Sequence, residues 1–120
     1  NETEASFYLK KNVESKTEIE IAAKKFLEKG VKNILITLGS KGVYFANSTE
    51  SYFTGAFKLK DKVVDTTGAG DAFNGAFAYA LSNNRTNKDA LEFANKVAGI
   101  STTRAGAANA MPELKEVESY

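Results

Sequence analysis

The sequence predicts an α/β fold, and three patterns carry this prediction. Residues 17–29 place apolar side chains at helical spacing on one side only, which predicts a surface helix. Residues 33–38 are almost continuously apolar and rich in β-branched side chains, as in a strand buried on both faces of a parallel sheet. Residues 70–81 are apolar nearly all round, which predicts a central, buried helix. Helices that alternate with a buried strand are typical of α/β proteins.

The elements before residue 65 follow in order. We expect Thr17 and Glu20 to form a capping box at the start of the first helix, and Gly30 to end it. After the strand at 33–38, the glycine-containing segment 39–42 predicts a hairpin turn, and residues 43–46 resume a strand. A second turn and weaker strands are expected between residues 47 and 64.

The helical part of the chain comes next. The predicted helix 70–81 ends at 83–85, and Thr86, with Asp89 three residues later, predicts the start of a last long helix. Its inward-facing side is expected to comprise Ala90, Leu91, Ala94, Val97, Ala98 and Ser101. A glycine- and alanine-rich loop covers residues 102–111, and the tail after Pro112 carries only a weak pattern.

Length and charge limit the classes of function. A chain of 120 residues fits one domain with one core, and we see no linker within it. Sixteen basic and 15 acidic residues are interspersed, so no basic stripe indicates nucleic-acid binding, and small molecules are the expected partners. The absence of Cys and His excludes disulfides and thiolate metal sites and leaves acid–base chemistry to carboxylates, Lys or Tyr.

The location of the protein is predicted from what its sequence lacks. No apolar stretch approaches the roughly 20 residues that a membrane span needs, and the first residues do not form a signal peptide. We therefore expect a cytoplasmic protein with no membrane partner. Because the chain begins without Met and directly on a polar motif, we also expect it to be a piece of a longer polypeptide.

The segment 65–75 combines two aspartates, two close glycines and the start of a helix. Gly68 and Gly70 allow the backbone to turn its N–H groups inward, and the positive end of the helix dipole faces the same place. Such a site favours a phosphate. Asp71 at the helix start could accept a proton from a hydroxyl group that attacks this phosphate. The segment therefore predicts phosphoryl transfer to an alcohol, although a tight turn into a helix remains the plainer interpretation.

Three other segments allow both a functional and a plain interpretation. The segment 37–42 follows a predicted strand, where α/β sheets place ligands, and could bind a nucleotide or form only a hairpin. The first four residues offer an amide and carboxylates for magnesium, or are simply solvated. The segment 102–107 could hold a cation through backbone carbonyls, or could end a helix with an Arg. Neither the Walker pattern nor the dinucleotide-binding glycine pattern is present.

Taken together, four segments resemble the C-terminal portion of the ribokinase-like carbohydrate kinases. These are the Asn-x-x-Glu pattern at 1–4, the loop at 36–42, the Asp-Thr-Thr-Gly-Ala-Gly-Asp signature that begins at Asp65, and the loop at 103–107. They occur in the family's order over nearly the whole chain. The resemblance implies the C-terminal portion of a three-layer α/β/α fold, with parallel core strands, a β-hairpin and packed helices. Residues 1–120 would then be the ATP-binding and catalytic portion, without the sugar-binding half and lid.

The resemblance also implies a reaction and roles for single residues. The reaction would be ATP-dependent phosphorylation of a sugar's primary hydroxyl, with D-ribose as the expected sugar and ribose 5-phosphate as the product. Asp71 would contact the sugar as the catalytic base, and the N–H groups of Gly68, Ala69 and Gly70 would form an anion hole. The ATP site would comprise Asn1, Thr37, Gly39, Ser40, Lys41, Gly42, Gly70 and Asn95.

Two cations are implied in the same way. Glu4 would hold magnesium through water, together with Asn1. Potassium would be bound by Asp65 and Thr67 and by backbone carbonyls near Ser101, Arg104 and Gly106. Ala110 stands where family members often offer a hydroxyl to this cation. A homodimer is one option for the full-length parent, whose oligomeric state the resemblance leaves open.

Other interpretations stay open. The chain could be a non-catalytic nucleotide-binding fragment or module, or part of a kinase for fructose, a nucleoside or another sugar. A Rossmann-like dehydrogenase is disfavoured by the missing glycine fingerprint.

Overall fold

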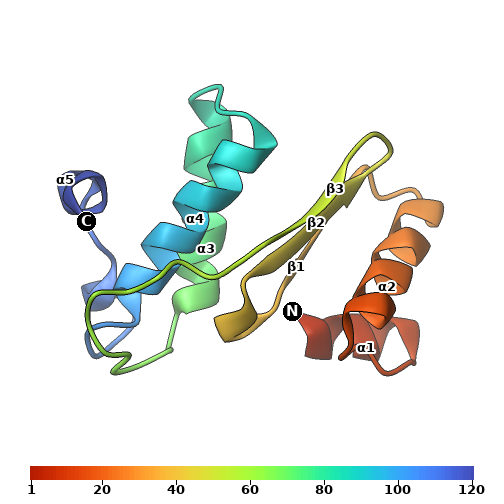
Figure 1. The fold of residues 1–120 in the computed structure, drawn as a ribbon, viewed down its shortest axis with the longest axis horizontal. Helices are drawn as coiled ribbons and strands as arrows, with labels where there is room; N and C mark the ends of the chain where they lie inside the picture. The colour runs from red at the N-terminus through yellow and green to blue at the C-terminus, as the bar shows by residue number, and fades with distance from the viewer. The chain divides into compact units, whose positions relative to one another are not determined.

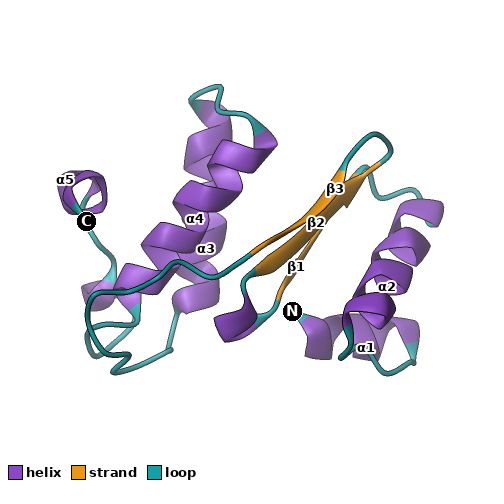
Figure 2. Cartoon of the chain, viewed as in Figure 1, coloured by secondary structure: helices purple, strands orange, loops and turns teal.

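The computed structural model describes residues 1–120 as two compact units, Asn1–Gly55 and Ala56–Tyr120 (Figure 1). The first unit contains, in order, α1 (Glu2–Leu9), α2 (Lys16–Glu28), β1 (Asn33–Thr37), the short 3₁₀ helix η1 (Gly39–Lys41), β2 (Val43–Asn47) and β3 (Ser51–Thr54). The second contains α3 (Ala69–Ser82), α4 (Asn87–Ser101), the 3₁₀ helix η2 (Ala108–Ala110) and α5 (Leu114–Ser119). All three strands therefore belong to the first unit, while helices and loops make up the second (Figure 2).

The sheet of the first unit is an antiparallel meander in the order β1–β2–β3. Tyr44 in the middle strand pairs with Ile36 on one side and with Phe53 on the other. The parallel pairing expected for residues 33–38 is wrong within this chain. The reason is the short connection, because a parallel neighbour requires a crossover of a dozen or more residues whereas a tight turn returns the chain antiparallel.

The core of the first unit lies between α1, α2 and one face of this sheet. Even-numbered positions of β1 and β2 face the helices, together with Phe53 of β3, which is the cross-strand partner of Tyr44; this follows the period of two in a strand. The buried members of this core are Ala5, Val13, Ile19, Ala22, Ala23, Ile36, Leu38, Tyr44 and Ala46. The segment 39–42 is thereby fixed at both ends, since the strands on either side of it contribute to the core.

The start of α2 differs from the expectation by two residues. Ser15 is the N-cap: its hydroxyl accepts from the Glu18 N–H at 3.2 Å, and Glu18 Oε2 accepts from the Ser15 N–H at 3.2 Å. The capping box expected at Thr17 and Glu20 is wrong because both pairs have the required spacing, and the sequence alone does not rank them. Gly30 follows the helix with a φ of +97°, as its predicted role as a stop requires.

Two further elements differ from the sequence predictions. The weaker strands expected up to residue 64 shrink to β3, and residues 55–68 contain no strand. The polar start of the chain forms α1, and the tail forms α5, neither of which was expected. Both helices are short, and short helices carry little periodic signal.

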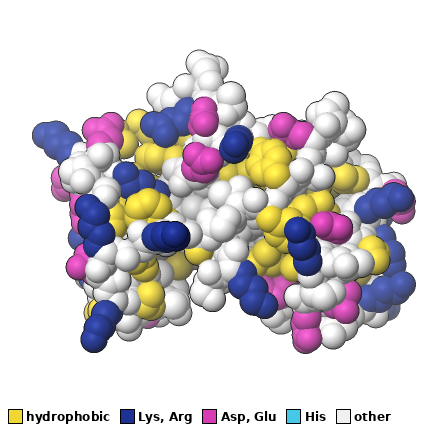
Figure 3. Space-filling model, viewed as in Figure 1, with side chains coloured by type: hydrophobic (Ala, Val, Ile, Leu, Met, Phe, Trp, Pro, Cys, Tyr) yellow, Lys and Arg dark blue, Asp and Glu magenta, His cyan; other side chains and the backbone are white.

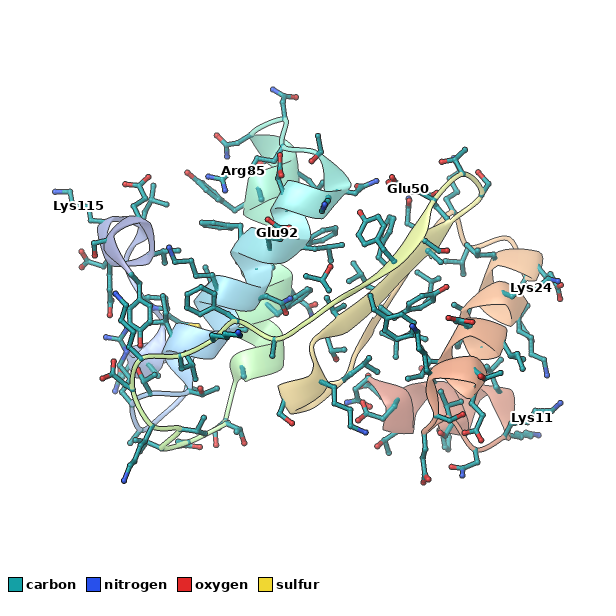
Figure 4. All side chains as sticks on the ribbon, viewed as in Figure 1. Lys11, Lys24, Glu50, Arg85, Glu92 and Lys115 are labelled. Carbon is teal, nitrogen blue, oxygen red and sulfur yellow. The ribbon has the colours of Figure 1, made fainter.

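The second unit is built on the α3–α4 pair, whose helices pack against each other (Figure 1). Thr86 caps α4 as predicted, because its hydroxyl accepts from the Asp89 N–H at 3.2 Å. Near the connection between the helices, the Arg85 guanidinium carbon lies 4.5 Å from the centre of the Phe93 ring. Arg85 is labelled in Figure 4, as is Glu92 on α4. This contact closes the end of the pair that is distant from the start of α3.

Helix α3 is half-buried rather than buried on all sides. Ala72, Phe73, Ala76 and Ala80 are buried, whereas Tyr79 is 44% exposed. The expectation of a fully buried helix is wrong for this chain because only one partner helix in its unit, α4, covers it. Asp71 lies on the exposed side of α3.

The surface matches the charge pattern of the sequence. Basic and acidic side chains are interspersed on the face drawn in Figure 3, with no continuous basic stripe. None of the helices is long and apolar enough to span a membrane.

Candidate functional site

The start of α3 is a turn that directs backbone N–H groups outward. Gly68 is the N-cap, with a φ of +76°, and Ala72 N donates to its carbonyl at 2.9 Å. The N–H groups of Gly68, Gly70 and Asp71 have no acceptor within the chain, as is usual in a first helical turn. The Ala69 N–H, however, donates to the Thr66 carbonyl at 3.2 Å. The amides beside Ala69 are therefore the better donors for an anion.

Asp71 is the acidic residue of this first turn, and it is exposed. The helix dipole at this end favours negative charge, whether it belongs to a side chain or to a ligand. A carboxylate oxygen and unpaired N–H donors thus occur within one turn of helix. This combination suits a reaction in which a proton leaves one reactant while negative charge develops on another.

Asp65 holds the approach to this turn in place. Its Oδ1 accepts from the Thr67 N–H at 2.9 Å and from the Thr67 hydroxyl at 2.6 Å. Its Oδ2 accepts from the Gly106 N–H at 3.0 Å. These donors, the Thr67 hydroxyl first and then the Gly106 and Thr67 amides, lower the pKa of Asp65 to about 2. Asp65 is therefore a charged tie between two loops.

The loop that supplies Gly106 also presses on Gly68. A methyl group added at Gly68 would lie 3.0 Å from Ala107 Cβ and 3.2 Å from Ala107 Cα. The combination of a left-handed φ and this close approach explains why glycine occupies position 68. Asp65 and Ala107 thus fix the turn from two directions.

The end of α4 is hydrogen-bonded to the segment that leads to Asp65. The hydroxyls of Ser101, Thr102 and Thr103 each donate to the carbonyl three residues earlier, at 2.7 Å. The Thr102 carbonyl accepts from the Val64 N–H at 2.7 Å and from the Asp65 N–H at 3.1 Å. The helix end thereby satisfies its own last carbonyls and also fixes the backbone that leads to Asp65.

The structure brings together three of the residues expected to bind potassium. Asp65, Thr67 and Gly106 are directly hydrogen-bonded, and Arg104 belongs to the same loop as Gly106. The carboxylate is charged, which fits a monovalent cation, although its oxygens already accept three hydrogen bonds. Ser101 is buried, and its hydroxyl is engaged within α4. Only its backbone carbonyl fits the expected role.

The expected nucleotide loop lies in the first unit, between β1 and β2. Thr37 ends β1, and Gly39, Ser40 and Lys41 form η1. The Leu38 N–H donates to the Gly42 carbonyl at 2.8 Å and closes the loop. Gly39 and Gly42 have φ angles of +57° and +101°, so both glycines are needed for its shape. Asn95, expected near the nucleotide, lies half-buried on α4.

The expected magnesium residues at the chain start form a helix cap. Asn1 Oδ1 accepts from the Glu4 N–H at 2.9 Å, and Glu4 Oε2 accepts from the Asn1 nitrogen at 2.6 Å. Glu4 Oε1 is not used in the cap, which fits a contact to magnesium through water. No group of three or more acidic side chains gathers into a metal cage.

Sequence reasoning missed two residues that shape the site. Ala107 belongs to the loop 103–107 that the resemblance singled out, but its role, which is to fill the space beside Gly68, was not anticipated. Glu116 binds Arg104, with 2.7 Å between Oε1 and Nη2, and no pattern in the sequence pointed to it.

The chain is similar to known proteins over nearly its whole length. Residues 1–114 match the family described as pfkB family carbohydrate kinase. The chain is 42% identical over 122 residues to a ribokinase of Schizosaccharomyces pombe and 39% identical over 118 residues to one of Staphylococcus aureus. Each match covers 98% of this chain and 38% of the relative.

A solved structure agrees with these matches. The structure of Arabidopsis thaliana ribokinase complexed with ribose and ATP resembles this one with a TM-score of 0.94 at 36% identity, over 99% of this chain and 38% of that protein. This similarity confirms the ribokinase-like α/β fold that the four motifs predicted. The chain spans 38% of the length of the curated relatives that it matches. On the family match over residues 1–114 and the identities above 30%, the chain belongs to the pfkB family of carbohydrate kinases.

Proposed function

We propose that the complete protein phosphorylates the primary hydroxyl of a sugar with ATP, and that D-ribose is this sugar. The observation that carries the proposal is the start of α3, where an exposed carboxylate lies within one helical turn of N–H groups that have no acceptor. The named substrates of the Arabidopsis thaliana relative, ribose and ATP, support the choice of sugar and phosphate donor. This chain would contribute the C-terminal ATP-binding and catalytic portion.

In this reaction Asp71 takes the proton from the sugar's primary hydroxyl, and the hydroxyl oxygen forms a bond to the γ-phosphorus as the bond to ADP breaks. The N–H groups of Gly68 and Gly70, with that of Asp71, stabilise the charge on the transferring phosphoryl group. The Ala69 amide contributes less because Thr66 already accepts its hydrogen bond. The catalytic assignment of Gly68, Ala69, Gly70 and Asp71 is part of this proposal.

The other assigned residues bind and position. Asn1, Asn95 and the loop formed by Thr37, Gly39, Ser40, Lys41 and Gly42 would contact ATP. Magnesium, held through water by Glu4, would neutralise phosphate charge. Potassium, next to Asp65, Thr67 and the carbonyls of Ser101, Arg104 and Gly106, would fix the loop beneath the anion hole. Positioning of this kind is a large part of phosphoryl-transfer catalysis.

Replacing Asp71 tests the proposal. In the complete protein, Asp71→Asn removes the base and keeps the side chain's size, so turnover of ribose should fall by about 100-fold or more. Binding of ATP, measured by calorimetry, should stay nearly unchanged. Asp89→Asn is the matched control, because Asp89 also lies in the first turn of a helix, α4. Unchanged turnover in Asp71→Asn would contradict the proposal.

A nucleotide-binding fragment without turnover is the alternative for the 120-residue chain itself. The observation that favours it is the share of the relatives that the chain spans, 38%. Calorimetry with ATP and magnesium, followed by a phosphorylation assay with ribose, fructose and a nucleoside, distinguishes the two and identifies the sugar.

A further inference from the structure

Helix α5 is attached to the loop that follows α4. Glu116 Oε1 lies 2.7 Å from Arg104 Nη2, while Val117 on the same helix is only 3% exposed. At the end of α5, the Tyr120 hydroxyl donates to Asp61 Oδ2 at 2.8 Å. The helix therefore holds two segments, the loop around residue 104 and the chain that leads to Asp65.

The Arg104–Glu116 contact connects to the proposed anion site through a short series of bonds. Arg104 is two residues from Gly106, whose N–H donates to Asp65 Oδ2 at 3.0 Å. Asp65 Oδ1 in turn accepts from both the N–H and the hydroxyl of Thr67, the residue before Gly68. Every member of this series lies in the unit Ala56–Tyr120.

A second route runs through packing. Ala107, three residues after Arg104, leaves no room for a side chain at Gly68, where the added methyl would come within 3.0 Å. A shift of the 104–107 loop therefore acts on the turn twice, through the Gly106 hydrogen bond and through the Ala107 contact. Although Ala107 is exposed, its Cα and Cβ lie close enough to position 68 for a movement of the loop to reach the turn.

The Arg104 side chain depends on Glu116. Its Nε is buried without a partner, and the hydrogen bond to Glu116 is made through Nη2. Both side chains are somewhat more than one third exposed, at 38% and 37%, so water weakens their attraction but does not replace the geometry. Without Glu116 the guanidinium would have to turn toward water to find an acceptor, and the loop backbone would follow it.

From these contacts we propose that Glu116 is a positioning residue for the phosphoryl transfer, acting through Arg104 on the loop that supports Gly68. This role requires no contact between Glu116 and either substrate. The catalytic consequence of this role rests on the proposed function. The structural part, which is the ordering of the 104–107 loop and the 65–68 turn, is independent of it.

The test is Glu116→Ala in the complete protein, which removes the acceptor of Arg104 Nη2, with Glu118→Ala as the control. Glu118 is an exposed carboxylate on the same helix, so its replacement removes the same charge without touching Arg104. Hydrogen exchange of peptides that contain residues 65–69 and 104–107 should be faster in Glu116→Ala than in the wild type and unchanged in the control. The kcat for ribose should fall about 10- to 100-fold, as expected for misplaced reacting groups, with the KM for ATP changed less than about twofold. The exchanged pair Arg104→Glu with Glu116→Arg should restore part of the loss.

Each outcome decides one part of the inference. Unchanged exchange in both peptides would overturn it, even if kcat fell, because Glu116 would then act elsewhere. Faster exchange with unchanged kcat would overturn the catalytic role. Faster exchange in a protein whose wild type phosphorylates no sugar would refute the proposed function and leave the ordering role supported. If Glu116→Ala does not fold, Glu116→Asp, which keeps the charge and shortens the reach, is measured in the same way.

Discussion

At Gly68 the backbone enters the left-handed region immediately before α3, and the space beside it is filled by Ala107. Both conditions select glycine for physical reasons that involve no ligand. The same conditions leave the neighbouring amides pointing away from the helix, where an anion can reach them. Shape and proposed chemistry therefore depend on one residue.

Gly68→Ala in the complete protein should lower the free energy of unfolding by about 1–2 kcal/mol from the left-handed conformation alone, and further from the contact with Ala107. Denaturation in urea measures this. Gly55→Ala is the control, because its methyl would meet no atom within 4 Å and its φ is not in the left-handed region. Equal losses at the two positions would show that the turn at Gly68 is not constrained as described.

The low pKa of Asp65 implies that acid reduces this residue's contribution to the free energy of unfolding. Its pKa is about 2 in the folded protein against an ordinary value of 3.8, so folding favours the charged form. This contribution to stability is complete above pH 3.8 and is lost as the pH falls toward about 2. The difference in free energy of unfolding between wild type and Asp65→Asn should therefore shrink over this interval, as followed by urea denaturation at each pH. A difference that stays constant down to pH 2 would mean that Asp65 is not the charged tie between the loops.

Among the elements, α2 illustrates a local ambiguity. Ser15 with Glu18 and Thr17 with Glu20 both fit the capping pattern, and tertiary packing decides which pair forms the cap. Ile19, Ala22 and Ala23 must face the sheet, and this requirement fixes where the helix begins.

Ser15→Ala should lower the free energy of unfolding by about 1 kcal/mol because the Glu18 N–H loses its acceptor. Thr17→Ala, inside the helix, should change it by less than about 0.5 kcal/mol, the usual range for surface positions. Thermal or urea denaturation of the two variants compares them directly. A larger loss at Thr17 would place the cap where the sequence pattern first suggested it.

Helix existence was predictable where apolar periodicity was long, as in α2, α3 and α4, and was missed where it was short. In α1 only Ala5 is buried, while Phe7 and Tyr8 are 77% and 70% exposed, so no apolar side marked the helix. Strand direction was mispredicted because apolar content reports burial and not the partner. Pairing in β1 is decided by the short loop to β2.

The candidate site was predictable to the extent that its residues are neighbours in the sequence. Asp65, Gly68 and Asp71 fall within one motif, and the structure gives each a distinct local environment. The contact between Asp65 and Gly106 spans 41 positions, and only the family resemblance pointed to that loop. Neither the sequence motif nor the family resemblance indicated Glu116, because a carboxylate on a short helix has no pattern of its own.

On the scale of the whole molecule, the chain is two units that carry different parts of the proposed chemistry. The loop at 37–42 belongs to Asn1–Gly55, and the turn at 65–71 belongs to Ala56–Tyr120. Each is shaped by its own contacts: the first by a hairpin anchored in a helix–sheet core, the second by loops tied at Asp65.

The near contact of Gly68 with Ala107 has a consequence for how this site can fail. Two positions far apart in the sequence share a space that holds one methyl group, and Ala107 already fills it. Adding atoms at either position separates the loop from the helix, whereas removing the methyl of Ala107, which is exposed, would leave space that water can enter. The contact between the loop and the helix is therefore disturbed by larger side chains at position 68 or 107 more than by smaller ones. It accommodates only the smallest residues, glycine and alanine.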